Sequence, residues 1–340
     1  MSKVVCFGEI MGRFNPDGFL RIVQGSSFHL SFAGGEANVA VALSNFGQRS
    51  SFVTKLPDND LGVAAMRELR RYGVDVSDIV MGGDRLGLYF VEKGASQRAS
   101  KVIYDRKHSA VTESVPDDFD WDRIFKDAAW FHFTGITPAL SDGLAEIVKD
   151  ALKAAKAKGL TVSCDINYRA KLWPEQKAGR VMRDLMPYVD VCISNEEDAE
   201  KVFGIRASQS DVSKGQISEN GYRSVARRLA ECFGFNTVAI TLRGSLSASD
   251  NEWAGILYAG ENFFVSPKYT VHLVDRVGGG DSFGGALIYG MINGFPAQKA
   301  IDFAVAASCL KQTIEYDFNQ VTTDEVWKLV NGDASGRVNR

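Results

Sequence analysis

The stretch VDRVGGGDSFGGALIYGMINGF, residues 274–295, joins an acidic step to three consecutive glycines, an aspartate and a pattern typical of a helix. Glycine has no side chain, so the backbone N–H groups of Gly278, Gly279 and Gly280 can approach a ligand closely. A helix that begins at such a loop points unpaired N–H groups and the positive end of its dipole at the same place. The stretch therefore predicts a binding site for an anion, typically phosphate.

Asp281 follows the glycines, where its negative charge opposes a bound anion. An aspartate near a helix start is usually a cap, because its side chain accepts a hydrogen bond from the first turn. The alternative is a general base that acts on a group reacting with the anion. The stretch alone leaves both interpretations open.

Composition indicates a globular protein of one large domain, or a domain with a smaller appendage. The chain has 340 residues, of which 45% are hydrophobic, and a formal net charge of −3. The N-terminus lacks a signal-peptide pattern and no apolar run reaches membrane-spanning length, so we expect a cytoplasmic protein with no membrane partner. No basic cluster indicates nucleic acid binding. The five cysteines show no CxxC spacing and the four histidines are scattered, which argues against a zinc site.

Strand-like and helix-like segments alternate along most of the chain. Uninterrupted apolar strands that alternate with helices favour an α/β fold with a doubly wound, mostly parallel sheet flanked by helices. Polar residues that follow such strands meet at one edge of the sheet, where ligands bind. Strands are predicted at 3–10, 130–135, 160–167, 189–195 and 236–244, helices at 61–72, 142–158, 175–186, 221–233 and 297–313, and antiparallel strands within 247–274.

A small β appendage interrupts this alternation. Two short strand-like runs within residues 86–107 flank a polar segment, which is a hairpin signal. We expect one domain at 1–331, with an appendage formed mainly by about 11–32 and 84–108, and a polar tail at 332–340. Neither a GxxxxGK[ST] loop nor a GxGxxG after the first strand is present, so an NAD-dependent oxidoreductase lacks its fingerprint.

Two motifs resemble one known family. AGGEANVAVALSNFG, residues 33–47, resembles the N-terminal signature of the ribokinase (PfkB) carbohydrate kinases, and DRVGGGD, residues 275–281, resembles their C-terminal signature DTxGAGD. SNEEDAE, residues 194–200, is similar to the family's metal-associated NxxE segment. The resemblance extends to about residue 330. It implies a ribokinase-like fold with a β lid over the sugar, ATP and Mg²⁺ as cofactors, and a homodimer or higher homo-oligomer formed through the lid.

The chain departs from the second signature at two positions. Gly279 replaces the usual alanine, which the anion site should tolerate because it uses backbone amides only. Arg276 replaces the usual threonine, and the sequence offers either a solvated side chain or a phosphate contact for it.

Further segments resemble the 2-keto-3-deoxygluconate kinases of that family: GLYFVEKGASQR, VIYDRKHSA, DINYRAKLW, TLRGSLSA and KQTIEYDFN. The resemblance implies ATP-dependent phosphorylation of this acidic sugar to its 6-phosphate. Arginines suit such a substrate, because a guanidinium binds a carboxylate through two parallel hydrogen bonds. The alternatives are a kinase for another sugar, such as fructose, and a non-catalytic sugar-binding protein on the same fold.

The resemblance also assigns residues. It makes Asp281 the general base and the loop of Gly278, Gly279 and Gly280 the anion hole. The expected sugar contacts are Gly34, Gly35, Asn38, Tyr89, Tyr104, Arg106 and Arg169. The expected nucleotide contacts are Asn195, Thr241, Arg243, Gly244, Ser245, Gly278, Gly280, Ala307, Lys311 and Asn319. The expected metal-site residues are Glu196 and Asp275, and the alternative for Asp275 is that it helps to hold the glycine loop.

Several of these residues have a structural alternative. Arg106 fits a solvated strand edge, and Arg169 fits a structural ion pair. Asn38 and the Asn195-Glu196 pair fit helix starts, and Ala307 fits ordinary helix packing.

Overall fold

The computed structural model describes residues 2–195, 197–207 and 219–333. Its large sheet has the strand order β14-β13-β12-β11-β10-β9-β1-β4, and β15 pairs with β13. The strands that pair in parallel are β1 (Lys3–Phe7), β4 (Ser50–Val53), β9 (Ala128–Thr134), β10 (Thr161–Asp165), β11 (Val191–Ser194) and β12 (Thr237–Ser245). The antiparallel strands are β13 (Asp250–Ala259), β14 (Asn262–Val265) and β15 (Tyr269–His272). The predicted α/β sheet and the antiparallel strands within 247–274 are both confirmed.

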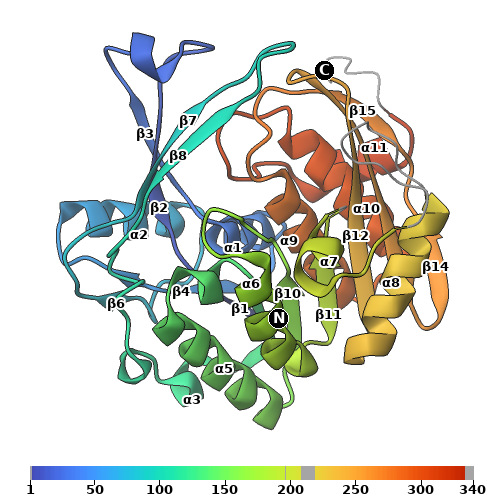
Figure 1. Cartoon of the computed structure of the whole chain (residues 1–340), viewed down its shortest axis with the longest axis horizontal. Coiled ribbons are helices and arrows are strands. Elements are labelled where there is room, and N and C mark those ends of the chain that lie inside the picture. Colours follow the sequence, from blue (N-terminus) through green and yellow to red (C-terminus); the bar gives the residue numbers. More distant parts are fainter. Residues whose placement is uncertain (1, 196, 208–218, 334–340) are drawn as a thin grey trace.

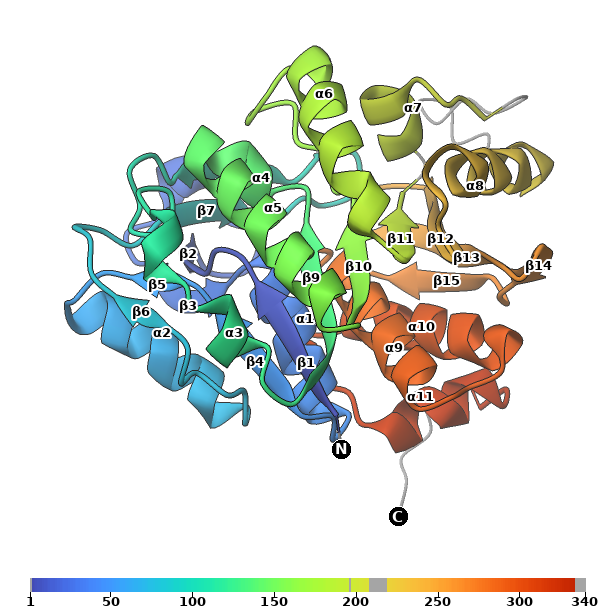
Figure 2. The same ribbon diagram turned by 90° about the horizontal axis from the view of Figure 1, so that it is seen from below.

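Helices cover both faces of this sheet, as Figure 2 shows most clearly. One face carries α1 (Gly35–Asn45), α2 (Asp60–Arg71), α9 (Gly279–Ile292) and α10 (Ala297–Lys311), with α11 (Thr323–Val330) packed on α10. The other carries α3 (Trp121–Ile124), α4 (Thr137–Leu140), α5 (Asp142–Ala157), α6 (Glu175–Leu185), α7 (Asp198–Phe203) and α8 (Glu219–Phe233). Within β1, Val5 and Phe7 join one core cluster while Val4 and Cys6 join another. Burial on both faces explains why these strands are apolar without alternation.

Short elements complete the fold. They are the strands β5 (Lys55–Leu56) and β6 (Val80–Met81) and the 3₁₀ turns η1 (Ile22–Gln24), η2 (Pro116–Asp118) and η3 (Met186–Tyr188). Helix α11 was not anticipated, although Thr322 and Glu325 form a capping box at its start that the sequence displays. No helix in the described ranges is long and apolar enough to cross a membrane.

A separate small sheet projects from the body in Figure 1. Its strand order is β3 (His29–Ala33), β2 (Met11–Asn15), β7 (Leu88–Glu92) and β8 (Lys101–Asp105). The β2–β3 and β7–β8 pairs are antiparallel hairpins, and a parallel β2–β7 ladder joins them. These strands fall within 11–33 and 88–105, so the expected β appendage is present. Its role as a lid and as an oligomer contact stays a prediction.

Candidate active site

Two cavities open at the carboxyl ends of the parallel strands. The larger, of about 410 Å³, is lined by residues that follow β10 and β11, by residues of β12, and by the glycine loop. The smaller, of about 90 Å³, lies between α1, the small sheet and the same loop. Asn167, Arg169, Val277 and Asp281 line both. The two cavities therefore adjoin at Asp281, an arrangement that suits two reactants meeting at one carboxylate.

The glycine loop has the backbone that its sequence predicts. Gly278 precedes α9 with φ +82°, in the left-handed region that favours glycine, and a Cβ there would lie 2.1 Å from the carbonyl oxygen of Asp317. Gly279 and Gly280 form the first turn of α9, whose unpaired N–H groups and dipole favour an anion. A Cβ on Gly279 would meet the flexible Gln312 side chain at 3.3 Å, which agrees with tolerance of alanine at this position.

Asp281 is half-buried at the junction of the two cavities. Its carboxylate accepts a hydrogen bond of 2.6 Å from the Asn38 side chain of α1. Burial raises the pKa of Asp281 from 3.8 to about 6, although the Asn38 hydrogen bond lowers it. No backbone N–H of α9 donates to this carboxylate within the described part of the chain. The geometry thus favours a base over a cap, since the group is ionised at neutral pH yet more basic than an ordinary aspartate.

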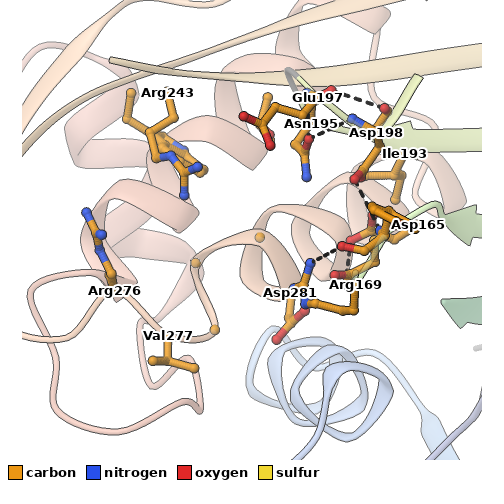
Figure 3. Close-up of a pocket in the computed structure, with 18 of the residues that line it drawn as sticks. Asp165, Arg169, Ile193, Asn195, Glu197, Asp198, Arg243, Arg276, Val277 and Asp281 are labelled. Atoms are coloured by element: carbon orange, nitrogen blue, oxygen red, sulfur yellow. Dashed lines mark hydrogen bonds between the residues drawn. The ribbon is translucent and has the colours of Figure 1, made fainter. Parts of the chain in front are cut away.

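All the predicted sugar contacts come together around the smaller cavity. They are Gly34 and Gly35 before and in α1, Asn38 of α1, Tyr89 of β7, Tyr104 of β8, Arg106, and Arg169 after β10. A Cβ on Gly34 would lie 1.8 Å from the carbonyl oxygen of Glu9, so only glycine fits there. Figure 3 places Arg169 beside Asp281.

Glu9 and Asp317 also line the smaller cavity and were not predicted. Glu9 accepts from Nε of Arg106 at 2.7 Å and from the Ser109 hydroxyl at 2.6 Å. Arg106 is therefore a buried ion-pair partner rather than a solvated strand-edge residue. Strand β1 ends at Phe7, whereas the predicted strand ran to residue 10, so the strand-end rule passed over Glu9.

The predicted nucleotide contacts fall into two groups. Asn195, Thr241, Arg243, Gly278 and Gly280 line the larger cavity. The other predicted contacts, which are Gly244, Ser245, Ala307, Lys311 and Asn319, are not among its lining residues.

The last three of these lie in α10 and in the segment that follows it. Ala307 is fully buried in the core beside α9, which matches its helix-packing alternative. Lys311 donates to backbone carbonyl oxygens of the loop, and Asn319 donates to the Ser282 hydroxyl at 2.6 Å. The contacts of Lys311 and Asn319 therefore support the glycine loop and the first turn of α9.

Of the two predicted metal-site residues, Glu196 lies outside the described residues. Asp275 is 3% exposed, and its carboxylate pairs with Arg13 at 2.5 Å and accepts from the Val277 N–H at 3.1 Å. These contacts hold the loop. The Asn195 side chain accepts from the N–H groups of Glu197 and Asp198, at 2.8 and 3.0 Å, in the turn that leads into α7.

The residues present fit a magnesium ion that keeps most of its waters. Within the described ranges, no group of three or more His, Cys, Asp or Glu side chains is placed to hold a metal directly. Hydrated Mg²⁺ needs only one or two carboxylates together with phosphate oxygens. Asp165, Glu197 and Asp198 supply carboxylates on the cavity wall. Burial, with the nearby Asp198 and Asp281, raises the pKa of Asp165 well above its usual value, and a cation would reverse this effect.

Arg276, which the sequence left unexplained, faces the larger cavity. Figure 3 shows Arg243 and Arg276 on one side of this cavity, opposite Asp165 and Asp281. Arg276 donates to the Asn251 side chain at 3.3 Å, and burial together with the charge of Arg243 lowers its pKa. An anion between these two guanidinium groups relieves their repulsion, so the pair is suited to phosphate.

Comparisons with known protein families, sequences and structures all find carbohydrate kinases. The pfkB family carbohydrate kinase pattern matches residues 1–316. A 2-dehydro-3-deoxygalactonokinase of Haloferax volcanii is 36% identical over 335 residues, which is 98% of each chain. A 2-dehydro-3-deoxygluconokinase of Thermoproteus tenax is 32% identical, covering 91% of this chain and 88% of the relative. The crystal structure of a Thermotoga maritima 2-dehydro-3-deoxygluconokinase has 50% identity and a TM-score of 0.95, covering 98% of this chain and all of the other.

Proposed function

The chain belongs to the pfkB family of carbohydrate kinases, and on that premise we propose that it uses ATP to phosphorylate 2-keto-3-deoxygluconate (2-dehydro-3-deoxygluconate) on its 6-hydroxyl group. The observation that carries this proposal is the position of Asp281, where the two cavities adjoin and beside the glycine loop. The smaller cavity receives the sugar and the larger receives ATP. The sugar's 6-hydroxyl then lies between Asp281 and the terminal phosphoryl group.

Asp281 accepts the proton of the 6-hydroxyl as its oxygen attacks phosphorus. Phosphoryl transfer otherwise needs positioning and charge stabilisation rather than covalent help from the protein. The backbone amides of Val277, Gly278, Gly279 and Gly280 and the N-terminus of α9 stabilise the charge on the transferred group. General base catalysis contributes roughly 10²–10⁴-fold, or about 3–5 kcal/mol.

The carboxylate of the sugar binds Arg169. One terminal nitrogen of Arg169 donates to the carbonyl oxygen of Tyr168 at 3.0 Å, which leaves further N–H groups for a bidentate contact. Arg106 already faces Glu9, whose negative charge disfavours a second carboxylate beside it. The Arg106–Glu9 pair is better suited to sugar hydroxyl groups, to which it offers both donors and acceptors.

Arg243 and Arg276 bind the phosphates of ATP from the side of the cavity opposite Asp281. The carboxylates of Asp165, Glu197 and Asp198 would hold a hydrated Mg²⁺ through its waters. When bound, Mg²⁺ neutralises charge on the phosphate oxygens.

A second candidate substrate is 2-dehydro-3-deoxygalactonate, because the Haloferax volcanii relative is named for that sugar. It has the same carboxylate and 6-hydroxyl groups and differs at one carbon. The contacts proposed for Arg169 and Asp281 apply equally to both sugars, so discrimination rests on the residues around the remaining hydroxyl groups.

An assay of ADP release with ATP and Mg²⁺ tests the proposal. The acceptors are the two keto acids and fructose, each at several concentrations, with the Asp281→Asn variant as the inactive control. We expect kcat/KM for 2-keto-3-deoxygluconate to exceed that for fructose by at least about 10²-fold, since fructose lacks the carboxylate and one charge-assisted contact is worth about 3 kcal/mol. Preference for fructose would refute the acidic-sugar assignment. Binding without turnover of any sugar would favour a non-catalytic sugar-binding protein.

A further inference from the structure

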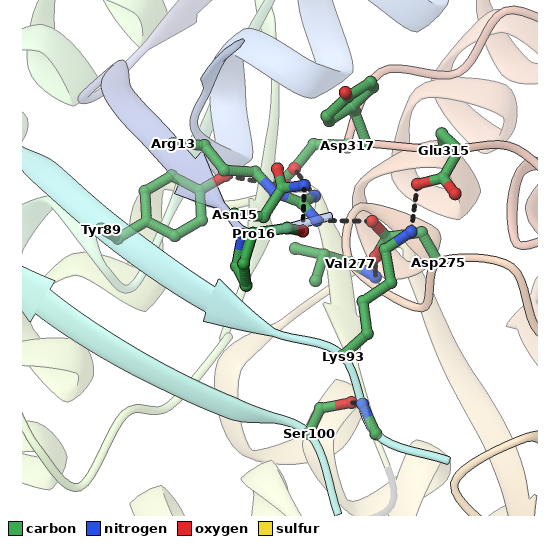
Figure 4. Close-up of polar contacts among 12 residues, drawn as sticks. Arg13, Asn15, Pro16, Tyr89, Lys93, Ser100, Asp275, Val277, Glu315 and Asp317 are labelled. Carbon is green, nitrogen blue, oxygen red and sulfur yellow. Dashed lines mark hydrogen bonds and ion pairs between the residues drawn. The ribbon is translucent and has the colours of Figure 1, made fainter. Parts of the chain in front are cut away.

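A buried ion network joins the small sheet to the glycine loop (Figure 4). Its centre is Arg13 of β2, which is 0% exposed. One terminal nitrogen of Arg13 pairs with Asp275 at 2.5 Å, and the other pairs with Asp317. Tyr89 of β7 donates its hydroxyl to the other oxygen of Asp317 at 2.9 Å. Two strands of the small sheet therefore reach the same carboxylate, that of Asp317.

A second buried cation completes the network from the α10 side. Lys311, also 0% exposed, donates to the carbonyl oxygens of Asp275, at 3.2 Å, Val277 and Tyr316. Arg13 and Lys311 balance the charges of Asp275 and Asp317. Burial alone disfavours the charge of Arg13, but Asp317 and Asp275 raise its pKa above the usual value, so Arg13 is a cation at any working pH.

Asp275 and Asp317 both contact the backbone of the glycine loop. Asp275 accepts the N–H of Val277 at 3.1 Å. The carbonyl of Asp317 packs against Gly278, where a Cβ would lie 2.1 Å away. Asp317 also lies close enough to Asp281 to raise the pKa of that group. The network therefore contacts the loop proposed as the anion hole and affects the pKa of Asp281, the proposed base.

We propose that Arg13 is a positioning residue for phosphoryl transfer, which fixes the glycine loop to the small sheet that carries the sugar contact Tyr89. This proposal rests on the function proposed above. Since Arg13 pairs with one carboxylate on each side of the glycines, its removal frees the loop amides from the sheet and leaves Asp275 and Asp317 without their shared cation. Misplaced loop amides lower transition-state stabilisation more than substrate binding.

Two substitutions of Arg13 test this proposal. We expect Arg13→Met to lower kcat at least tenfold with a smaller change in KM for the sugar. Arg13→Lys should restore only part of the loss, because one ammonium group cannot reproduce the fork that spans two carboxylates. The matched control is Lys93→Met, which removes an ion pair between the same sheet and Glu315, a half-exposed residue of the same segment as Asp317. We expect its kcat to stay within about twofold of wild type, because the carboxylate of Glu315 is half-exposed and this pair contacts neither the glycine loop nor Asp281.

The pH dependence separates positioning from a loss of stability. Arg13→Met leaves the negative charge of Asp317 without its partner, so the acid limb of kcat should move to higher pH. Asp317→Asn removes a negative charge near Asp281, so the same limb should move to lower pH. The second variant leaves the Arg13–Asp275 pair in place and so provides a test even if Arg13→Met folds poorly.

Hydrogen exchange gives a readout that does not depend on catalysis. In peptides that cover residues 274–283, exchange should be faster in Arg13→Met than in wild type and unchanged in Lys93→Met. If wild type phosphorylates no sugar but the exchange result holds, the proposed function fails while the loop attachment stands. If wild type is active and Arg13→Met is folded, with kcat within twofold and unchanged exchange, the positioning role of Arg13 is refuted.

Discussion

Replacement of Asp281 by asparagine should abolish turnover and at the same time stabilise the fold. The side chain keeps its size and can still accept the hydrogen bond from Asn38. It can no longer accept the proton of the sugar hydroxyl. We expect kcat to fall by at least about 10²-fold. Affinity for ATP should be retained, because the loop amides and the arginines of the larger cavity are untouched.

The gain in stability follows from the pKa of Asp281. Its value is about 6 in the folded protein, against 3.8 for an ordinary aspartate. The folded state therefore binds the proton more tightly than the unfolded state, so ionisation of Asp281 destabilises the fold. A difference of roughly 2 pKa units corresponds to about 3 kcal/mol at pH 8. Because Asp281 is half-buried and water reaches it, this figure is an upper limit.

The direction of the pKa shift of Asp281 also fixes the pH range in which its ionisation destabilises the fold. The destabilisation is fully present above the folded-state pKa of about 6 and disappears as the pH falls toward 3.8. Thermal unfolding of both proteins at pH 8, 6 and 4.5 measures it, since other titrating groups cancel in the difference. We expect the Asn variant to melt up to about 5 °C higher at pH 8, with a difference that shrinks at lower pH. An Asn variant that melts lower than wild type at pH 8, or a difference independent of pH, would refute the reasoning.

Three further predictions concern the loop and the two cavities. Gly278→Ala should destabilise the protein by at least about 1–2 kcal/mol and lower kcat, because alanine is strained at φ +82° and its Cβ meets the carbonyl oxygen of Asp317. The control Gly279→Ala should leave both the melting temperature and kcat nearly unchanged. Arg276→Gln should weaken binding of a non-hydrolysable ATP analogue about tenfold by calorimetry, and an unchanged affinity would place the phosphates elsewhere. Arg169→Ala should raise KM for the keto acid by about 10–100-fold, as expected for a charge-assisted contact, and an unchanged KM would exclude it as the carboxylate partner.

Local patterns identified most of the fold, and the resemblance to a known family supplied the sugar side of the candidate site. The strands of the large sheet are buried on both faces, so their apolar runs were visible without knowledge of their neighbours. The sugar contacts that the resemblance implied line one cavity, which lies between the start of α1, the small sheet and the segment after β10. The left-handed turn at Gly278 agrees with the sequence, because glycine adopts a positive φ without the steric cost that other residues meet.

Contacts between segments that are far apart in the sequence could not be predicted from local patterns. Asp275 resembles a residue facing the cation until Arg13, 262 positions away, is seen beside it. In the stretch MGRFN an arginine reads as a solvent-facing strand residue, yet Arg13 is completely buried. Lys311 at the end of α10 and Asn319 in the segment after it show why polar residues near a signature are hard to assign. A polar side chain that supports a loop looks the same in the sequence as one that lines a cavity.

The pairing of β2 with β7 matters for chimeras that are designed to transfer substrate preference from one related kinase to another. The small sheet consists of two hairpins from separate parts of the sequence, and the parallel ladder, together with the stacked rings of Phe14 and Phe90, joins them into a single surface. Tyr89 and Tyr104 come from the second hairpin, whereas Arg13, which meets the same carboxylate as Tyr89, comes from the first. A chimera that transplants one hairpin alone would join mismatched halves, so the natural unit of recombination is both hairpins together with the segment that holds Asp317.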